Sequence, residues 1–298
     1  MTTYFLGIDA GSSSTKWALI DDQGNQVSRG KSAPVDGHLY REESKVRMNH
    51  FLSEIQKELK VSITGIYAGI TGASDSSSDN QAIETLFQQH FPQSKVKVVM
   101  DVALGYRANV RDDHGVYIYA GTGSIAVYKD LSGAHRTVGG WGYLLGDEGA
   151  GYWIGITALR TILFEIEKGS HDSRLSEIFS SEDQPISFMR IKELVYGSPR
   201  NEVAALAKGV ISLASDSDAR ALEIVKQAGS ELSQLVKRTQ ALIGSPDGPI
   251  IFGGGIARAS HELVEEMERI LQRKIQVSSD DLSLDAARFA LEDLAATN

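Results

Sequence analysis

The segment from Gly7 to Lys16 joins a carboxylate to a run of small residues. The apolar residues before Asp9 predict a strand, and the residues after it predict a tight turn into a second strand. Backbone N–H groups in such a turn can contact phosphate oxygens closely. Asp9 itself would repel phosphate, so we interpret it as a ligand, direct or through water, of the Mg²⁺ that accompanies a nucleotide. The turn residues are Gly11, Ser12, Ser13 and Ser14.

The alternative for this segment is an ordinary hairpin whose glycine serves the turn and whose Asp9 lies on the surface. Two common phosphate-loop patterns are excluded. No GxxxxGK[ST] pattern precedes a helix anywhere in the chain, and the loop after Asp9 opens into a strand, unlike the dinucleotide-binding loop.

Two further glycine loops follow strand-like segments. The first lies between two expected strands and predicts a second cradle of backbone amides. The other precedes an expected helix, whose N-terminal dipole favours an anion by about 0.3–1 kcal/mol. A glycine-rich hairpin and close helix–strand packing are the respective alternatives. The candidate nucleotide contacts are Gly121, Thr122, Gly123 and Ser124 in the first loop and Gly253, Gly254 and Gly255 in the second.

A fourth motif, Gly139–Trp153, is rich in glycine and carries two adjacent carboxylates among aromatic residues. We expect neither helix nor strand in it until a helix begins near Gly151. Carboxylates accept hydrogen bonds from hydroxyls, and aromatic faces cover C–H surfaces, so the loop is typical of a sugar site. The alternative is an N-terminal cap on the following helix, which suits Glu148 better than Asp147.

Asp101 follows the expected strand Val96–Met100. The carboxyl ends of strands in open α/β sheets face the ligand site. A carboxylate there can accept the proton of an attacking hydroxyl as a general base. The alternative is a helix N-cap, a position that Asp also favours.

The elements that must position these residues alternate between strands and helices. From Val116 the order strand, glycine loop, strand, turn, strand recurs, which indicates two similar α/β halves with a cleft between them. Residues 150–243 are mostly helical, and a single helix is expected over Arg258–Arg273. The other predicted strands are Tyr4–Ile8, Thr15–Ile20, Gln26–Gly30, Ile63–Ile70, Pro249–Phe252 and Ile275–Val277.

Composition excludes several classes of function. The chain has 298 residues, a formal net charge of −9 and no cysteine. Without cysteine there are no disulfides, cysteine-ligated zinc sites, iron–sulfur clusters or cysteine nucleophiles. The acidic surface without a basic patch disfavours nucleic acid and anionic membranes as partners. We read no signal peptide and no membrane span, so we expect a cytoplasmic protein.

The motifs together resemble a known family. Asp9–Lys16, Gly121–Ser124 and Gly253–Gly255 are similar, in this order, to the two phosphate motifs and the adenosine motif of the fold shared by actin, hexokinase and the heat-shock chaperones. Gly139–Trp153 resembles the signature loop of N-acetylglucosamine kinases in the BadF/BadG/BcrA/BcrD ATPase family.

The resemblance implies an α/β protein with a two-domain actin-like ATPase (ribonuclease H-like) fold. Each domain would be a mixed sheet flanked by helices, with ATP and sugar in the interdomain cleft. We expect domains at 1–112 and 113–285, the second with a helical insertion, and a closing helix at 286–298 that packs on the first. The family also implies a homodimer.

The same resemblance assigns roles to residues. Asp101 matches the catalytic base, and Asp9 matches the anchor that holds Mg²⁺ through water. Thr71–Ala73 is similar to a loop that faces the sugar, and Glu148 joins the sugar-binding set from its own chemistry. The candidate sugar contacts are therefore Thr71, Gly72, Gly140, Trp141, Asp147 and Glu148.

Three positions depart from the family pattern. Ile125 stands where the animal kinases carry an amide side chain near the sugar. The segment Ala33–His38 lacks an expected Asn, for which Asp36 or His38 could substitute. The first motif looks like that of the dehydratase activators, but that branch needs cysteine-ligated iron–sulfur clusters and cannot operate here.

We therefore expect an ATP- and Mg²⁺-dependent kinase that phosphorylates an amino sugar, foremost the 6-hydroxyl of N-acetylglucosamine. One alternative is a kinase for glucosamine or an N-acetylmuramic acid-type cell-wall sugar. A non-catalytic sensor that binds ATP and sugar, or a bare ATPase acting on a protein partner, are the others.

Overall fold

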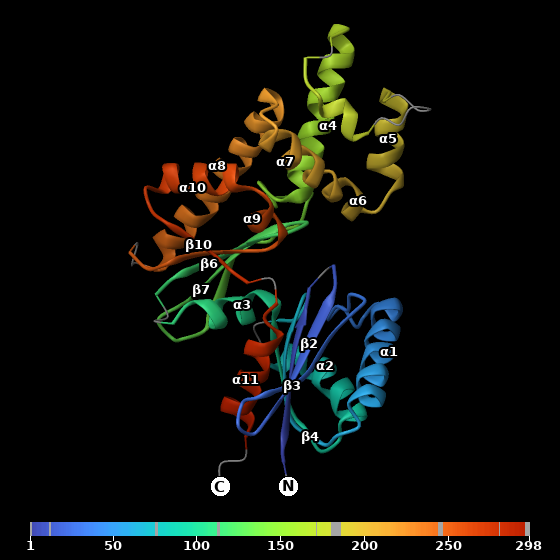
Figure 1. Cartoon of the computed structure of the whole chain (residues 1–298), viewed down its shortest axis with the longest axis vertical. Coiled ribbons are helices and arrows are strands. Elements are labelled where there is room, and N and C mark those ends of the chain that lie inside the picture. The colour runs from blue at the N-terminus through green and yellow to red at the C-terminus, as the bar shows by residue number, and fades with distance from the viewer. Residues whose placement is uncertain are drawn as a thin grey trace. The chain divides into compact units, whose positions relative to one another are not determined.

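The computed structural model describes residues 2–11, 13–74, 77–111, 114–170, 172–179, 186–243, 247–279 and 281–295, with the backbone alone at 77–79. The chain divides into two compact units (Figure 1). Unit 1 comprises 1–111, 131–135 and 279–298, and unit 2 comprises 112–130 and 136–278. No helix of the described residues is long and apolar enough to cross a membrane.

Unit 1 is built on a five-stranded mixed sheet in the order β3-β2-β1-β4-β5. The first three strands are antiparallel neighbours, whereas β4 is parallel to β1 and β5 is parallel to β4. Asp21 closes the β2–β3 turn by accepting hydrogen bonds from the backbone of Gln23 and Asn25. The strands are β1 (Tyr4–Ala10), β2 (Thr15–Asp21), β3 (Gln26–Ser32), β4 (Ile63–Ile70) and β5 (Lys95–Met100).

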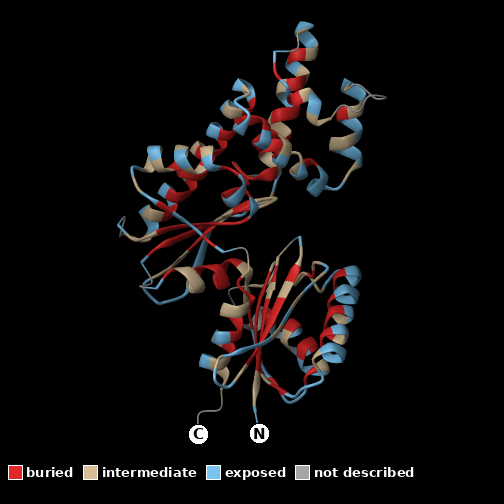
Figure 2. Ribbon diagram, in the orientation of Figure 1, coloured by how far each residue is buried: buried red, intermediate tan, exposed pale blue. Residues whose placement is uncertain are grey.

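Helices cover both faces of this sheet because successive strand residues point to opposite sides. Leu6 and Ile66 face a core that includes Met48 and Phe87 of the first two helices. Phe5 and Tyr67 face the other core, where the small residues of the last helix allow it to lie close to β1. Figure 2 shows the buried strands between helices that are exposed on their outer sides. These helices are α1 (Glu42–Leu59), α2 (Ser77–His90), α3 (Asp101–Asn109) and α11 (Ser283–Leu294).

The sheet of unit 2 has the order β10-β9-β6-β7-β8. Read from its other edge, this is the strand order of unit 1, with an antiparallel β6–β7 pair and with β9 parallel to both β6 and β10. The internal repeat predicted from the glycine loops therefore corresponds to a shared sheet topology in the two units. The strands are β6 (Val116–Ala120), β7 (Ser124–Lys129), β8 (His135–Gly139), β9 (Ile250–Gly253) and β10 (Ile275–Val277).

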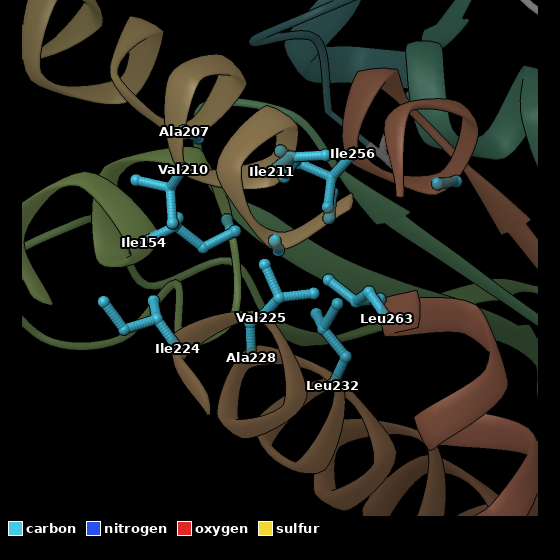
Figure 3. Packing of buried hydrophobic residues seen from close by; sticks show 14 of the residues in the cluster. Ile154, Ala207, Val210, Ile211, Ile224, Val225, Ala228, Leu232, Ile256 and Leu263 are labelled. Carbon is cyan, nitrogen blue, oxygen red and sulfur yellow. The ribbon is translucent and has the colours of Figure 1, made fainter. Parts of the chain in front are cut away.

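The core of unit 2 joins this sheet to a long amphipathic helix and its neighbours (Figure 3). The buried side of α8 repeats at the spacings of one, three and four residues that are typical of an amphipathic helix. It includes Ile224, Val225, Ala228 and Leu232. The helices are α4 (Gly151–Lys168), α5 (Phe188–Gly197), α6 (Arg200–Ala205), α7 (Ala207–Ser215), α8 (Ala219–Ile243), α9 (Gly255–Ala259) and α10 (His261–Leu271), with a 3₁₀ turn at Leu175–Ile178.

One expected helix is wrong. The chain is not a single helix over Arg258–Arg273, because it breaks at Ser260 between α9 and α10. Ser260 has extended backbone angles (φ −129°, ψ 108°), and its hydroxyl accepts a hydrogen bond from the N–H of Leu263. Apolar periodicity continues across the break, but the buried serine caps a new helix.

Candidate active site

Three sequence-predicted residues of unit 1 lie at one edge of its sheet. In the β1–β4 pair, Asp9 lies opposite Gly69 and Ala10 lies opposite Ile70. On its other side, Ile70 of β4 lies opposite Met100 of β5. The parallel strands β1, β4 and β5 therefore end together, and the N–H of Thr71 donates to the carbonyl of Ala10 at 2.9 Å. This register places Asp9, Thr71 and Asp101 beside one another.

Asp101 is the first residue of α3, directly after β5. Its Oδ1 accepts a hydrogen bond from the N–H of Val102 at 2.9 Å, and the hydroxyl of Thr71 donates to the same carboxyl group. Burial raises the pKa of Asp101 to about 6, the Asp9 charge adds to the rise, and the hydrogen bonds oppose it. The N-cap of α3 is Met100, so the alternative role of Asp101 as an N-cap is not the one it adopts.

Asp9 lies near the end of β1, where its Oδ2 accepts a hydrogen bond from the N–H of Leu282 at 3.2 Å. No group of three or more His, Cys, Asp or Glu residues able to hold a metal occurs in the described part of the chain. A single carboxylate suits Mg²⁺, which keeps several waters and takes its other ligands from substrate phosphates. The donor set therefore fits Mg²⁺ bound together with a nucleotide.

The first glycine loop is a tight turn closed by a 3.2 Å hydrogen bond from the N–H of Gly11 to the carbonyl of Ser14. Ser13 is exposed, Ser14 is half-buried, and Ser12 lies outside the described residues. A Cβ built on Gly11 would meet nothing nearer than 3.8 Å. Folding of the chain does not itself require glycine there, and the open space leaves room for a ligand beside the backbone.

The segment expected to replace the missing Asn lies against the Thr71 loop. The N–H of Gly37 donates to the carbonyl of Thr71 at 2.9 Å, and a Cβ on Gly72 would lie 2.3 Å from the ring of His38. Asp36 accepts hydrogen bonds from His38 and from Arg47 of α1, the latter at 2.7 Å. Burial raises the pKa of Asp36, but its hydrogen bonds outweigh burial and lower it overall.

In unit 2 the second glycine loop is tied to the start of α4. The N–H groups of Gly151 and Tyr152 donate to the carbonyls of Gly121 and Thr122 at 2.8 and 3.1 Å. The hydroxyl of Ser124 donates to the carbonyl of Glu148 at 2.9 Å. The loop carbonyls are thus bound to the helix, and the loop and the Gly139–Trp153 segment form one connected structure.

Asp147 is the strained residue of that structure. It is 7% exposed and has a positive φ of 63°, which is uncommon for a residue other than glycine. Burial raises its pKa, although backbone N–H groups of Ser124 and Gly142 donate to its carboxylate. A Cβ on Gly123 would lie 2.3 Å from its Oδ2, so the glycine makes room for the carboxylate. The N-cap of α4 is Ala150 with no side-chain hydrogen bond, so neither Asp147 nor Glu148 is that cap.

The third glycine motif lies beside the second. A Cβ on Gly254 would lie 2.1 Å from the carbonyl oxygen of Ala120, the last residue of β6, and φ of Gly254 is +99°. Close packing therefore requires glycine at position 254, whether or not its backbone also contacts a nucleotide. A Cβ on Gly253 would meet Tyr117, whereas Gly255 is exposed and has open space around it.

A hollow of about 210 Å³ lies between the Gly139–Trp153 segment and α8. The segment contributes Gly139, Trp141, Asp147 and Glu148 to the lining. Gly140 instead packs against Ile125, the residue that departs from the family pattern. The α8 wall of the hollow was not predicted from the sequence; it consists of Glu231, Gln234, Leu235 and Arg238.

Two mixed sheets with one strand order, each flanked by helices, define the two-domain fold of sugar kinases and actin-like ATPases, which confirms the predicted fold class. The sequence pattern of the BadF/BadG/BcrA/BcrD ATPase family matches residues 6–283. The chain belongs to this family.

Individual proteins resemble the chain over most of its length. It is 27% identical over 284 residues to the N-acetylmuramic acid/N-acetylglucosamine kinase of Clostridium acetobutylicum, with 90% of each chain covered. The structure of a candidate N-acetylglucosamine kinase from Porphyromonas gingivalis superposes with a TM-score of 0.78 at 19% identity, covering 97% of this chain and 99% of the other. A second candidate, from Chromobacterium violaceum, gives 0.74 at 22% identity with the same coverage.

Proposed function

We propose that this protein is an ATP-dependent amino-sugar kinase that converts N-acetylglucosamine and ATP to N-acetylglucosamine 6-phosphate and ADP. The observation that carries the proposal is the carboxylate of Asp101 at the carboxyl edge of the unit 1 sheet, beside Asp9 and Thr71. Membership of an ATPase family and similarity to the Clostridium acetobutylicum kinase support it.

In the proposed reaction, Asp101 accepts the proton of the sugar hydroxyl while the hydroxyl oxygen forms a bond to the γ-phosphorus. The bond between that phosphorus and the ADP oxygen breaks. A base with a pKa of about 6 is ionised at neutral pH and still basic enough to take the proton. Thr71 orients the carboxyl group through its hydroxyl.

The other residues bind and orient the two substrates. Bound Mg²⁺, anchored by Asp9 through water, would neutralise charge on the phosphates. The candidate sugar contacts are Thr71, Gly72, Gly140, Trp141, Asp147 and Glu148. The phosphates and adenosine would contact Gly11, Ser12, Ser13, Ser14, Gly121, Thr122, Gly123, Ser124, Gly253, Gly254 and Gly255.

The test is ADP release with Mg²⁺-ATP and glucose, glucosamine, N-acetylglucosamine or N-acetylmuramic acid. We expect N-acetylglucosamine to stimulate release, and Asp101→Asn to slow it by about 10²- to 10⁴-fold while nucleotide still binds. Asp22→Asn, which neutralises an exposed carboxylate at the β2–β3 turn, is the matched control. ADP release that ignores every sugar would indicate a bare ATPase, and nucleotide binding without turnover would indicate a sensor.

A further inference from the structure

One face of α8 forms a wall of the hollow beside the Gly139–Trp153 segment. Glu231, Gln234 and Arg238 stand at spacings of three and four residues, which places them on one side of the helix. Leu235 on the same side packs against Gly139, so the wall is held to the segment by an apolar contact.

The size of the hollow indicates what it can hold. Its volume of about 210 Å³ is below the range of about 300–1,000 Å³ that is typical of pockets for whole ligands. Because Trp141, Asp147 and Glu148 border it, the hollow adjoins the residues assigned to the sugar. It therefore suits one substituent of the sugar ring rather than the whole substrate.

Arg238 has an unusual partner in this hollow. Its guanidinium lies over the ring of Trp141, 5.3 Å from the ring centroid. Within the described residues no ion pair joins it to a carboxylate, although Asp147, Glu148 and Glu231 line the same hollow. A contact with an aromatic face uses none of the guanidinium N–H groups as hydrogen-bond donors, so they can still bind a carboxylate in a two-pronged arrangement.

The remaining charges of the hollow make Arg238 decisive for an anionic ligand. Asp147 already accepts hydrogen bonds from backbone N–H groups, and Glu148 and Glu231 would repel a ligand carboxylate. Without Arg238 every ionisable side chain known to line the hollow would be acidic. A neutral substituent needs no such compensation, since carboxylates and Gln234 can hydrogen-bond to hydroxyl and amide groups.

We propose that Arg238 is a specificity-determining residue that allows the site to accept an amino sugar bearing an ether-linked carboxylate, such as N-acetylmuramic acid, in addition to the uncharged sugar. This inference rests on the proposed kinase function and names the wider substrate class of the same site. Arg238 binds the carboxylate through its guanidinium edge while Trp141 holds the guanidinium plane.

The test compares sugars of three charges, the anionic N-acetylmuramic acid, the neutral N-acetylglucosamine and the cationic glucosamine. For each we would measure kcat/KM, and binding by titration calorimetry, in the wild type, Arg238→Met and Arg238→Lys. The Lys variant keeps the cation but loses the planar fork. Lys237→Met is the matched control, because it removes one positive charge from the adjacent, exposed position that does not line the hollow.

We expect Arg238→Met to lower kcat/KM for the anionic sugar about 10- to 100-fold more than for the neutral sugar. Arg238→Lys should fall between the wild type and Arg238→Met, and glucosamine should lose least. The control should leave the ratio between the sugars as in the wild type.

An equal loss for the anionic and neutral sugars would overturn the inference, since Arg238 would then only support the Trp141 loop. A wild type that phosphorylates N-acetylglucosamine but neither binds nor phosphorylates N-acetylmuramic acid would overturn it as well. A third outcome separates the two proposals: the wild type binds the anionic sugar, Arg238→Met loses that binding, and no sugar is phosphorylated. In that case the inference stands and the kinase proposal fails.

Discussion

At the scale of single residues, the carboxyl group of Asp101 is under opposing demands. A general base must be ionised, whereas burial and the neighbouring charge of Asp9 favour its protonated form. The hydrogen bonds from Val102 and Thr71 favour the ionised form and keep the pKa near 6. The group is thus held in a form useful for proton transfer at the expense of folding stability at neutral pH.

Asp101→Asn should make the protein more stable as well as much less active. Because the pKa of Asp101 is higher in the folded state (about 6) than its ordinary 3.8, the folded state binds the proton more tightly. Stability therefore falls as pH rises from about 4 to about 6, and Asn removes this loss. We expect a gain of roughly 1–3 kcal/mol at about pH 8 that disappears near pH 4, measured by urea denaturation. An Asn variant that is less stable at both pH values would contradict this account.

Glycine serves two purposes among the candidate phosphate-binding loops. At Gly123 and Gly254 the missing Cβ makes room for another part of the chain, the Asp147 carboxylate and the Ala120 carbonyl. A Cβ on Gly11 would have only the carbonyl oxygen of Ser14 within 4 Å, and a Cβ on Gly255 would have no atom within 4 Å. The first pair is required by folding of unit 2, whereas space around the second pair remains for a ligand.

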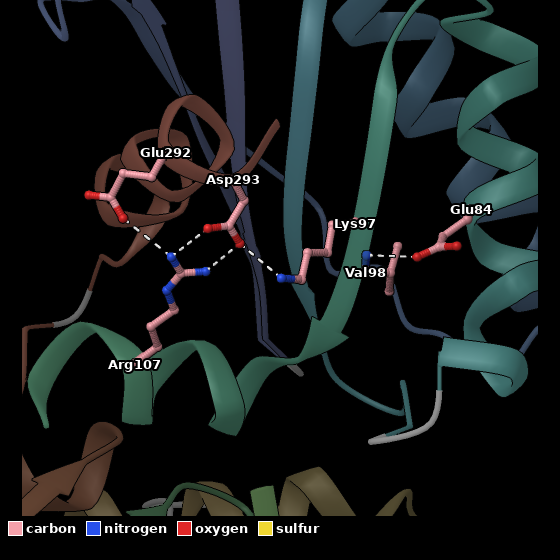
Figure 4. Close-up of polar contacts among 6 residues, drawn as sticks. All are labelled: Glu84, Lys97, Val98, Arg107, Glu292 and Asp293. Atoms are coloured by element: carbon pink, nitrogen blue, oxygen red, sulfur yellow. Dashed lines mark hydrogen bonds and ion pairs between the residues drawn. The ribbon is translucent and has the colours of Figure 1, made fainter. Parts of the chain in front are cut away.

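At the scale of elements, a charged cluster joins α3 to α11 within unit 1 (Figure 4). Arg107 of α3 donates to both oxygens of Asp293, at 2.7 and 2.9 Å, and to Glu292 at 3.2 Å. Lys97 of β5 donates to Asp293 at 2.8 Å. The helix α3 begins with Asp101, and Leu282, the residue before α11, donates its N–H to Asp9. The cluster therefore links the two helices that adjoin the carboxylates of Asp101 and Asp9.

Asp293→Asn should destabilise unit 1 in a pH-dependent way. The hydrogen bonds and charges of Arg107 and Lys97 lower the pKa of Asp293 to about 2, against the opposing effect of burial. The stabilisation is therefore present above its ordinary pKa of 3.8 and is lost as pH falls through about 2. We expect a cost of about 1–2 kcal/mol at neutral pH that shrinks in acid, measured by urea denaturation.

Glu292→Gln is the matched control for this prediction. Glu292 is 61% exposed and makes one contact with Arg107, so its replacement should cost less than about 0.5 kcal/mol. Equal losses in the two variants, or a loss for Asp293→Asn that does not depend on pH, would show that the ion pairs do not hold α3 to α11.

At the scale of the whole molecule, the two units have separate hydrophobic cores. One large cluster fills unit 2, and two clusters on opposite faces of the sheet fill unit 1. Each unit therefore has the burial needed to fold cooperatively by itself, and two-state unfolding is not expected of the complete chain.

Core substitutions in the two units should move different unfolding transitions. Leu52 of unit 1 and Ile162 of unit 2 are 0% and 1% exposed, and truncating either to Ala should cost about 2–5 kcal/mol. In scanning calorimetry we expect Leu52→Ala to lower one transition and Ile162→Ala the other. A single transition lowered equally by both variants would mean that the units unfold together.

The sequence by itself determined the local features of this protein. The strands that end near Asp9 and just before Asp101, the three glycine loops and the irregular Gly139–Trp153 segment all follow from short-range spacing and from residues with special backbone preferences. The motif order was also enough to indicate the family. The break at Ser260 was missed because apolar periodicity continues across it.

Only the tertiary structure decided which of these features meet. The order β1-β4-β5 brings Asp9, Thr71 and Asp101 to one edge, although they are far apart along the chain. In the sequence, Glu231, Gln234 and Arg238 are indistinguishable from the solvent-facing side of an amphipathic helix. Their place beside Trp141 depends on how α8 packs under the glycine-rich segment, and such long-range packing leaves no periodic signal in either segment.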